Sequence, residues 1–393
     1  MNIGKLLNQK VVDMKPSGIR KFFDIVATMP DAISLGVGEP DFKTPWRIRQ
    51  TAIETLEKGK TVYTANAGLM ELRKEIADYF KRTIHLDYDP EHEIIVTVGG
   101  SEAIDISIRT IVEPGDEVLI VEPCFVCYAP IVVLSGGIPV IIETKAENEF
   151  RLTSEELREK ITDKTKLLVL PYPNNPTGAI MDRNDLEAIA EVLRETNIFV
   201  LSDEIYSELT YSDKHCSIAE IDGMKERTIV INGFSKGFAM TGWRLGFMAG
   251  PEGIIKHILK LHQYAIMSSP TTSQYAAVTG LRECADDVEK MRREYDMRRR
   301  FVVDSFNKLG LDCFTPQGAF YVFPCIKSTG LTSDEFCERL VYSKKVAVVP
   351  GTAFGECGEG FIRVSYAYSI KHLQEALKRI GEFLEELKEN NDE

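Results

Sequence analysis

The chain has 393 residues, of which 44% are hydrophobic and 27% are charged, a composition typical of a globular protein of about two to three domains. Its formal net charge of -13 argues against general nucleic-acid binding, which depends on neutralising phosphates. No segment approaches the ~20 apolar residues that span a bilayer, and the first part of the chain lacks the apolar stretch of a secretory signal. We therefore expect a cytoplasmic protein that binds neither nucleic acid nor membrane.

The cysteines do not predict a disulfide framework, because eight of them in a chain of this length are too dilute. Cys124 and Cys127 form a C-x-x-C pair, which is compatible with a redox or metal element. No second pair has metal spacing, and the six histidines are scattered singly. We interpret the two cysteines as reduced thiols in a loop and expect no metal site.

The middle of the chain alternates short apolar runs with amphipathic stretches such as 184–195. The apolar runs, rich in Val, Ile and Leu, lie at 94–98, 117–121, 138–142, 166–170, 198–202 and 228–232. Continuous apolar runs between helices are typical of a parallel sheet that is buried on both faces. The sequence therefore predicts the α/β class, with a mostly parallel sheet flanked by helices.

The C-terminal part has a different pattern. It predicts a long polar-faced helix over 285–308, a closing helix over 372–389, and short strands at 320–323, 346–349 and 361–365. Arginines between positions 292 and 300 are interspersed with acids, which indicates a solvated helix face. We predict a large domain over 46–284 and a smaller α+β domain built from 1–45 and 285–393.

Polar groups follow three successive strand candidates, and ligands bind at the carboxyl ends of strands in such sheets. The run 166–170 leads to Asn175, the run 198–202 to Asp203 and Tyr206, and the run 228–232 to Ser235 and Lys236. Each group alone has an ordinary alternative, such as a helix cap or a solvated charge. Together they suit a pyridoxal ring, which needs a lysine amine for its aldehyde, a carboxylate for its pyridine nitrogen and donors for its phenolic oxygen.

A phosphate would need its own cradle. Residues 94–98 are followed by Gly99, Gly100 and Ser101 and by a helical stretch from about Glu102, and a glycine turn into a helix N-terminus offers backbone N–H groups to an anion. Ser235 and Arg244 would add a hydroxyl and a guanidinium. Arg363, in the apolar run 361–365, is either an exposed edge charge or a bidentate clamp for a substrate carboxylate.

These motifs resemble those of class I aminotransferases of fold type I, in the subgroup of bacterial aspartate and aromatic aminotransferases. The resemblance extends from Gly36-Val37-Gly38-Glu39-Pro40-Asp41-Phe42 to Arg363, and its most specific element is the cofactor-lysine signature over 235–246. It implies a seven-stranded-type sheet, with 46–284 as the domain that binds pyridoxal 5'-phosphate.

The resemblance also implies residue roles. Lys236 would carry the cofactor as a Schiff base and shuttle the proton, Asp203 would pair with the pyridine nitrogen, and Asn175 and Tyr206 would contact the phenolic oxygen. The phosphate would lie against Gly100, Ser101, Glu102, Ser235 and Arg244.

Three further roles follow from the same resemblance. Tyr128 would stack on the cofactor, Gly38 would line the substrate pocket beside Tyr128, Asn175 and Arg363, and Tyr63 would reach the phosphate of a partner subunit. A homodimer with shared active sites is therefore expected. The segment 124–127 departs from the family pattern before Tyr128.

The expected reaction is transfer of an amino group between an L-amino acid, aromatic or aspartate, and a 2-oxo acid such as 2-oxoglutarate. One alternative is a carbon–sulfur β-lyase, which shares the lysine and the aspartate. A more remote alternative is a non-catalytic protein that senses pyridoxal phosphate, although the chain has no spare length or basic segment for a DNA-binding module.

Overall fold

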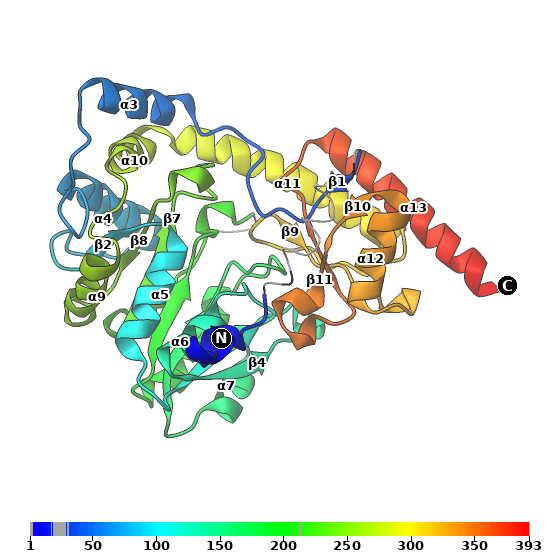
Figure 1. The fold of residues 1–393 in the computed structure, drawn as a ribbon, viewed down its shortest axis with the longest axis horizontal. Coiled ribbons are helices and arrows are strands. Elements are labelled where there is room, and N and C mark those ends of the chain that lie inside the picture. Colours follow the sequence, from blue (N-terminus) through cyan, green and yellow to red (C-terminus); the bar gives the residue numbers. More distant parts are fainter. Residues whose placement is uncertain (1–2, 17, 19–28, 30, 212–213, 393) are drawn as a thin grey trace.

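The computed structural model describes residues 3–16, 18, 29, 31–211 and 214–392. The chain forms two lobes side by side, and the long helix α11 (Ala285–Lys308) packs against elements of both (Figure 1). Among the described residues, no helix combines the length and the apolar character needed to cross a membrane. Part of the predicted 1–45 segment lies outside the described residues, and the domain boundaries stay a prediction.

A seven-stranded sheet forms the centre of the larger lobe. Its strands in spatial order are β2 (Ile94–Thr97), β8 (Gly246–Ala249), β7 (Thr228–Gly233), β6 (Phe199–Asp203), β5 (Thr165–Leu170), β3 (Glu117–Glu122) and β4 (Ile138–Glu143). All neighbours pair in parallel except β8, which is antiparallel to both β2 and β7. The predicted α/β class with a mostly parallel sheet is confirmed, whereas β8 was not predicted as a strand.

Helices cover both faces of this sheet. They are α4 (Met70–Ile84), α5 (Gly100–Ile111), α6 (Tyr128–Ser135), α7 (Ser154–Lys160), α8 (Arg183–Arg194) and α9 (Glu252–Ala265). Helix α10 (Thr271–Glu283) packs on α4, and α3 (Trp46–Glu57) packs on α10. Leu119 and Val121 of β3 belong to the apolar cluster that includes α7 and α8. Val118 and Ile120 belong to the cluster that includes α5 and α9. Because successive side chains of a strand point to opposite faces, both faces are buried, which explains the continuous apolar runs.

The smaller lobe has two short sheets. Strands β11 (Val349–Pro350), β12 (Ile362–Ser365) and β9 (Tyr321–Val322) form an antiparallel sheet in that order, and β1 (Ile33–Ser34) pairs in parallel with β10 (Val346–Ala347). Helices α12 (Ser333–Lys344) and α13 (Ile370–Asp392) pack against each other beside them. The prediction of one strand over 346–349 is wrong, because the chain passes from one sheet to the other at Val348.

Short helical segments complete the chain. They are α1 (Gln9–Val12) and the 3-10 turns η1 (Ile3–Leu6), η2 (Ala146–Asn148), η3 (Ser207–Leu209), η4 (Ile218–Glu220), η5 (Lys225–Arg227), η6 (Thr241–Trp243), η7 (Lys327–Thr329), η8 (Gly351–Phe354) and η9 (Glu356–Gly358).

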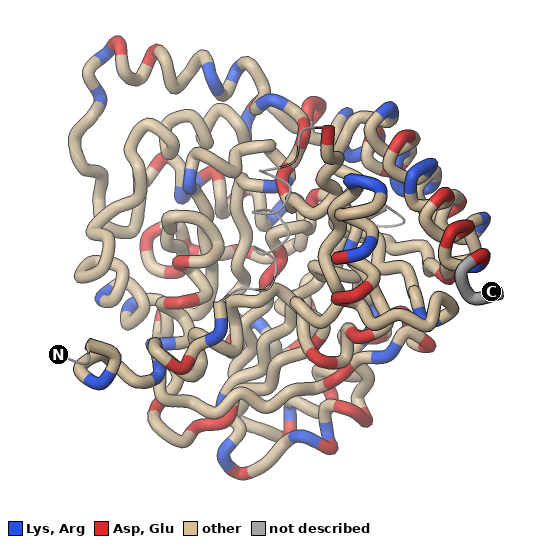
Figure 2. The backbone as a smooth tube through the Cα atoms, turned by 45° about the vertical axis from the view of Figure 1, so that its right-hand side comes forward, with Lys and Arg blue, Asp and Glu red and all other residues tan. Residues whose placement is uncertain are grey.

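Charges of both signs are distributed along the backbone (Figure 2). On α11 the prediction of a solvated arginine face is only partly right, because Arg298 and Arg299 are buried. Arg298 forms an ion pair of 2.8 Å with Asp41, and Arg299 pairs with Asp296 of the same helix and donates a hydrogen bond of 2.6 Å to the carbonyl oxygen of Pro316. A buried guanidinium is tolerated when it is paired and hydrogen-bonded, so these arginines fasten α11 to its surroundings.

Candidate active site

A cavity of about 590 Å³ lies where the carboxyl ends of β5, β6 and β7 meet the smaller lobe. It brings together residues far apart in sequence, as the position of the parallel strand ends predicts. The predicted site residues that line it are Gly38, Gly100, Ser101, Tyr128, Asn175, Asp203, Tyr206, Ser235, Lys236, Arg244 and Arg363. Glu102 and Tyr63 do not line it.

Lys236 lies on the loop that follows β7, and its Nζ atom donates a hydrogen bond of 2.6 Å to the carbonyl oxygen of Gly38. Burial lowers the pKa of Lys236 to about 8; the nearby negative charge of Glu39 opposes this shift, and Arg363 adds to it. A substantial fraction of the amine is therefore neutral near physiological pH. A neutral amine in a cavity is a nucleophile for a carbonyl group.

Asp203 is the last residue of β6 and is 7% exposed. Its Oδ2 atom accepts a hydrogen bond of 2.7 Å from the Tyr128 hydroxyl. Burial raises the pKa of Asp203, and the hydrogen bond from Tyr128 counteracts part of that shift. No described basic side chain forms an ion pair with it, so a cationic group in the cavity would compensate the buried carboxylate.

Tyr128 begins α6, and the structure gives it a role that the sequence did not predict. Its ring is 1% exposed and lies edge-on to Phe125, with 6.3 Å between ring centroids. Its hydroxyl is committed to Asp203, and stacking on a cofactor stays a prediction. Cys124 and Cys127 are free, and burial raises the pKa of both thiols, so neither is an activated nucleophile.

An anion cradle is formed at the N-terminus of α5. Gly99 has φ +77°, and a Cβ atom on it would lie 2.8 Å from Nη2 of Arg244. A Cβ atom on Gly246 would lie 2.6 Å from the carbonyl carbon of Gly99, so the start of β8 packs directly on this turn. The unpaired N–H groups of the helix end, the Ser101 hydroxyl and the Arg244 guanidinium thus converge.

The side chain of Glu102 turns away from the cavity, and contact of its backbone with a phosphate stays a prediction. Its Oε2 atom accepts a 2.5 Å hydrogen bond from the Val98 N–H, and its Oε1 atom lies 2.7 Å from Nδ1 of the buried His262. The carboxylate therefore fastens the turn and does not face the cavity, where it would repel an anion. Only the backbone of Glu102 belongs to the helix end.

Arg363 of β12 is 3% exposed, which contradicts the alternative of a solvated edge charge. Its Nη1 atom donates a hydrogen bond of 2.9 Å to Oδ1 of Asn175, and Nη2 donates to the carbonyl oxygen of Gly36. The guanidinium carbon lies 4.5 Å from the ring centroid of Tyr321 and 4.7 Å from that of Phe354. Its buried Nε atom has no partner among the described residues. A carboxylate in the cavity is the natural complement of this cation.

Tyr321 and Glu39 are among the residues of the cavity that were not predicted as site residues. Tyr321 of β9 lies with its hydroxyl oxygen 2.8 Å from that of Tyr206. Glu39 also lines the cavity, next to Gly38. The run 320–323 signalled a buried strand, but all of it is aromatic or apolar, so its pattern carried no sign of which side chain faces a ligand.

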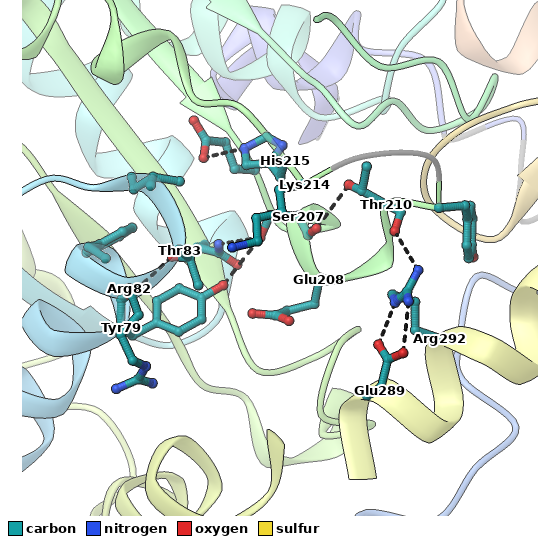
Figure 3. Close-up of a pocket in the computed structure, with 15 residues that line it drawn as sticks. Tyr79, Arg82, Thr83, Ser207, Glu208, Thr210, Lys214, His215, Glu289 and Arg292 are labelled. Atoms are coloured by element: carbon teal, nitrogen blue, oxygen red, sulfur yellow. Dashed lines mark hydrogen bonds and ion pairs between the residues drawn. The ribbon is translucent and has the colours of Figure 1, made fainter. Parts of the chain in front are cut away.

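A second cavity, of about 650 Å³, lies on the other side of the segment 203–211 (Figure 3). Most of its charged groups pair among themselves: Glu204 lies 2.7 Å from His215, and Arg292 pairs with Glu289 at 2.7 Å. None of the predicted site residues lines it. The first cavity is therefore the candidate active site.

Comparisons with known proteins agree with this geometry. A family model described as aminotransferase class I and II matches residues 30–380. The chain is 50% identical over 378 residues to the aspartate aminotransferase of Pyrococcus abyssi, covering 95% of this chain and 97% of that protein. It is 47% identical over 385 residues to aromatic-amino-acid aminotransferase 2 of Thermococcus litoralis, covering 97% and 99%. The crystal structure of the aromatic aminotransferase from Pyrococcus horikoshii OT3 is similar, with a TM-score of 0.90, 47% identity, and 93% and 99% covered.

Proposed function

Because the chain belongs to the aminotransferase class I and II family, in the aspartate and aromatic subgroup of fold type I, we propose that it binds pyridoxal 5'-phosphate on Lys236 and transfers amino groups from aromatic amino acids to 2-oxoglutarate. The observation that carries this proposal is the convergence of three groups on one cavity: the Lys236 amine, the Asp203 carboxylate and the Arg363 guanidinium. The family is pyridoxal-phosphate-dependent, and the cofactor when bound supplies an electron sink for breaking bonds at the amino-acid Cα atom.

The residues present fit this cofactor. The low pKa of Lys236, about 8, makes its amine available to the aldehyde. Oδ1 of the buried Asp203 accepts only a long hydrogen bond of 3.3 Å from the Ile205 N–H, and the carboxylate forms no ion pair with a described basic side chain, which suits a protonated pyridine nitrogen. The glycine turn before α5 leaves space for a phosphate beside Arg244. Asn175 and Tyr206 would donate to the phenolic oxygen.

In the proposed reaction, Lys236 also removes and returns the proton at the substrate Cα atom. This role needs an amine that is neutral in part at working pH, which burial provides. Arg363 would hold the substrate carboxylate through its fork of N–H groups, with Asn175 keeping the fork in place at 2.9 Å. The two groups together fix the orientation of the Cα–H bond towards Lys236.

The cavity wall favours an aromatic donor over aspartate. Its basic side chains among the described residues are Lys236, Arg244 and Arg363. The proposal assigns the first two to the cofactor and Arg363 to the carboxylate that all amino-acid substrates share, so none is left for a side-chain carboxylate. Phe125 supplies apolar surface, worth about 25 cal/mol per Å² buried. Aspartate and 2-oxoglutarate both carry a second carboxylate, which this wall would hold through polar and water-mediated contacts. The similarity to an aspartate aminotransferase and to an aromatic-amino-acid aminotransferase supports transamination, rather than carbon–sulfur β-elimination or non-catalytic sensing, as the activity of this chain.

We further propose a cytoplasmic homodimer with shared active sites. Tyr63 is 78% exposed and lies outside the cavity of its own chain. Val62 next to it is also exposed, and the Thr271 hydroxyl donates a hydrogen bond of 2.7 Å to the Val62 carbonyl oxygen, so residues 62–63 lie beside the start of α10. Large exposed apolar side chains in one place are typical of an interface.

The test is kcat/KM for phenylalanine, tyrosine, aspartate, alanine and cystathionine, each with 2-oxoglutarate. We expect the two aromatic donors to lead. A clear preference for aspartate or alanine would keep the reaction and reject the aromatic assignment. Pyruvate and ammonia released from cystathionine without a keto acid would replace the proposal with the β-lyase.

A further inference from the structure

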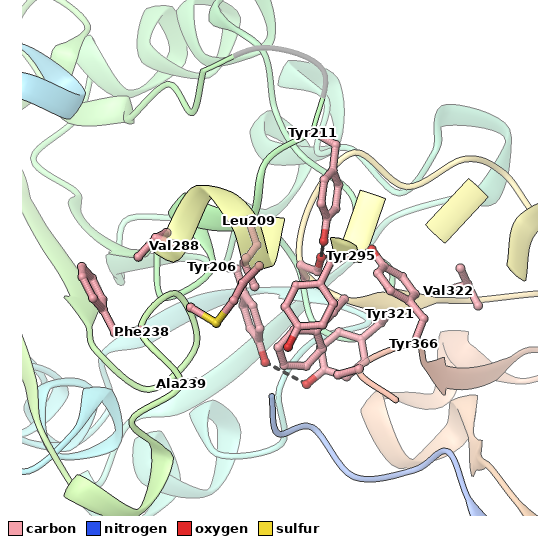
Figure 4. Packing of buried hydrophobic residues seen from close by; sticks show 14 of the residues in the cluster. Tyr206, Leu209, Tyr211, Phe238, Ala239, Val288, Tyr295, Tyr321, Val322 and Tyr366 are labelled. Carbon is pink, nitrogen blue, oxygen red and sulfur yellow. Dashed lines mark hydrogen bonds between the residues drawn. The ribbon is translucent and has the colours of Figure 1, made fainter. Parts of the chain in front are cut away.

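Tyr321 joins the two lobes at the centre of the cavity. It belongs to β9 of the smaller lobe, whereas Tyr206 follows β6 of the larger one, and their hydroxyl oxygens lie 2.8 Å apart (Figure 4). Both phenols are buried, with exposures of 1% and 4%. A buried hydroxyl with one good partner is held firmly, because leaving it unpaired costs free energy.

The same side chain contacts two other parts of the site. A Cβ atom on Gly38 would lie 2.3 Å from the Tyr321 hydroxyl oxygen, so this oxygen rests directly on the backbone of Gly38. The carbonyl oxygen of Gly38 is the atom that accepts from Lys236. The guanidinium carbon of Arg363 lies over the face of the Tyr321 ring, 4.5 Å from the ring centroid. One residue therefore contacts the carboxylate clamp, Tyr206 and the residue that holds Lys236.

We infer that Tyr321 is a positioning residue that acts through Tyr206, by donating its hydroxyl hydrogen to the Tyr206 oxygen so that Tyr206 can donate to the phenolic oxygen of the cofactor. The inference rests on the proposed function. A phenol has one hydrogen to donate, so the two hydroxyls form a directed chain only if Tyr321 is the first donor. Hydrogen bonds in a chain polarise one another, which makes Tyr206 a stronger donor than it would be alone.

This arrangement has a spectroscopic consequence. A donor at the phenolic oxygen withdraws negative charge from the cofactor and so weakens proton binding at its linkage to Lys236. Tyr321→Phe keeps the ring under Arg363 but removes the hydrogen bond. We expect the pH midpoint of the visible absorbance change of the loaded enzyme to rise by about half a unit to one unit, from a typical hydrogen-bond strength and the energy of one pKa unit.

Two matched variants separate this effect from a loss of packing. Tyr295→Phe removes a buried hydroxyl that has no partner among the described residues, from a ring only 5.6 Å from that of Phe320. Tyr366→Phe removes a hydroxyl that donates to the Ala319 carbonyl oxygen at 3.0 Å. Both should leave the absorbance midpoint unchanged, whatever they do to the melting temperature.

The decisive comparison is a double-mutant cycle. Tyr206→Phe alone should raise the midpoint more than Tyr321→Phe does, and adding Tyr321→Phe to it should cause no further rise, because Tyr321 acts only through the Tyr206 hydroxyl. In kinetics, Tyr321→Phe should lower kcat more than it raises KM, since the Arg363 contact with the ring is kept.

An unchanged midpoint in Tyr321→Phe, an equal shift in Tyr295→Phe, or additive shifts in the double variant would each overturn the inference and leave the proposed function intact. Failure of the proposed function has a different signature, namely that unmodified protein loaded with pyridoxal phosphate has no borohydride-trapped cofactor on Lys236.

Discussion

The Tyr128 hydroxyl donates a hydrogen bond of 2.7 Å to the Oδ2 atom of Asp203, and the acceptor is a buried carboxylate without a described basic partner. Burial raises the pKa of Asp203, and this hydrogen bond works in the opposite direction. Tyr128 therefore helps to keep Asp203 ionised, which is the state that a protonated ring nitrogen requires.

Tyr128→Phe is expected to lower kcat by roughly 10-fold, since a hydrogen bond to a charged group contributes about 1.5–3 kcal/mol and part of it is regained from the ligand. Asp203→Asn should lower kcat far more, by roughly 10²–10³-fold, because it removes the compensating charge itself. Steady-state kinetics on both variants check the order. Near-normal turnover in Asp203→Asn would mean that another group has this role.

Attachment of pyridoxal phosphate to the protein should accelerate as the pH rises through about 8, the pKa to which burial lowers Lys236. Below that pH only a fraction of the amine is neutral and nucleophilic, and above it the neutral form dominates. Absorbance after rapid mixing of cofactor-free protein with the cofactor measures the rate. Borohydride reduction and peptide mass analysis should place the label on Lys236, and Lys236→Ala should have none; a label on another lysine contradicts the assignment.

Arg363→Lys should lower kcat/KM for amino acids by roughly 10–100-fold, because lysine cannot present two parallel N–H groups to a carboxylate. The matched control is a change of substrate. An amine that has the same side chain but no carboxylate should react slowly with the unmodified enzyme and equally slowly with the variant. A similar loss for both substrates would mean that the substitution damages the site generally.

Tyr63 should serve the neighbouring subunit. Tyr63→Ala is expected to weaken pyridoxal phosphate binding by about 10-fold, the worth of one hydrogen bond to a charged group. Mixed dimers of Tyr63→Ala and Lys236→Ala chains contain one site with both residues intact, so mixing the two variants should raise activity when pyridoxal phosphate is limiting. Sedimentation that finds an active monomer, or mixtures without any gain, would contradict a shared site.

Glu122, at the end of β3, should make stability depend on pH. Burial, together with the charges of Glu143 and Glu356, raises its pKa to about 7 from a usual value of 4.5. The folded state therefore binds more protons than the unfolded state between these values, so this group's contribution to stability falls as the pH rises from 4.5 to 7. Glu122→Gln should raise the free energy of unfolding at pH 8 by about 1 kcal/mol, after allowing for solvent screening, and should have little effect at pH 4.5. The exposed Glu147→Gln is the control for thermal unfolding at both pH values.

The sequence allowed the large sheet to be predicted because its central strands are buried on both faces and so read as continuous apolar runs. Strand β8 was not predicted, because its four residues continue directly from the motif over 235–246 without a turn signal between them. The predicted groups at the ends of β5, β6 and β7 converge because parallel strands end at one edge.

The sequence could not predict the contacts between lobes. Tyr206 and Tyr321 are 115 positions apart, and no periodicity within either segment indicates which residue meets which. The side chain of Glu102 illustrates the same limit. The sequence predicted that Glu102 lies near the start of a helix. It could not predict that the Glu102 carboxylate pairs with His262, 160 positions away, and so points away from the cavity.

Strand β8 has a consequence for how the site tolerates change. Because β8 is antiparallel to its neighbours, Gly246 at its start pairs with Gly233 at the end of β7. The two ends of the segment 234–245 therefore lie side by side at the edge of the sheet. Lys236 and Arg244 both belong to this loop between β7 and β8. An insertion or deletion there would displace the proposed covalent anchor and the proposed phosphate anchor together, whereas the other loops that line the cavity each carry only part of the proposed site. Length variation in engineered libraries should therefore be accepted at those loops and rejected within 234–245.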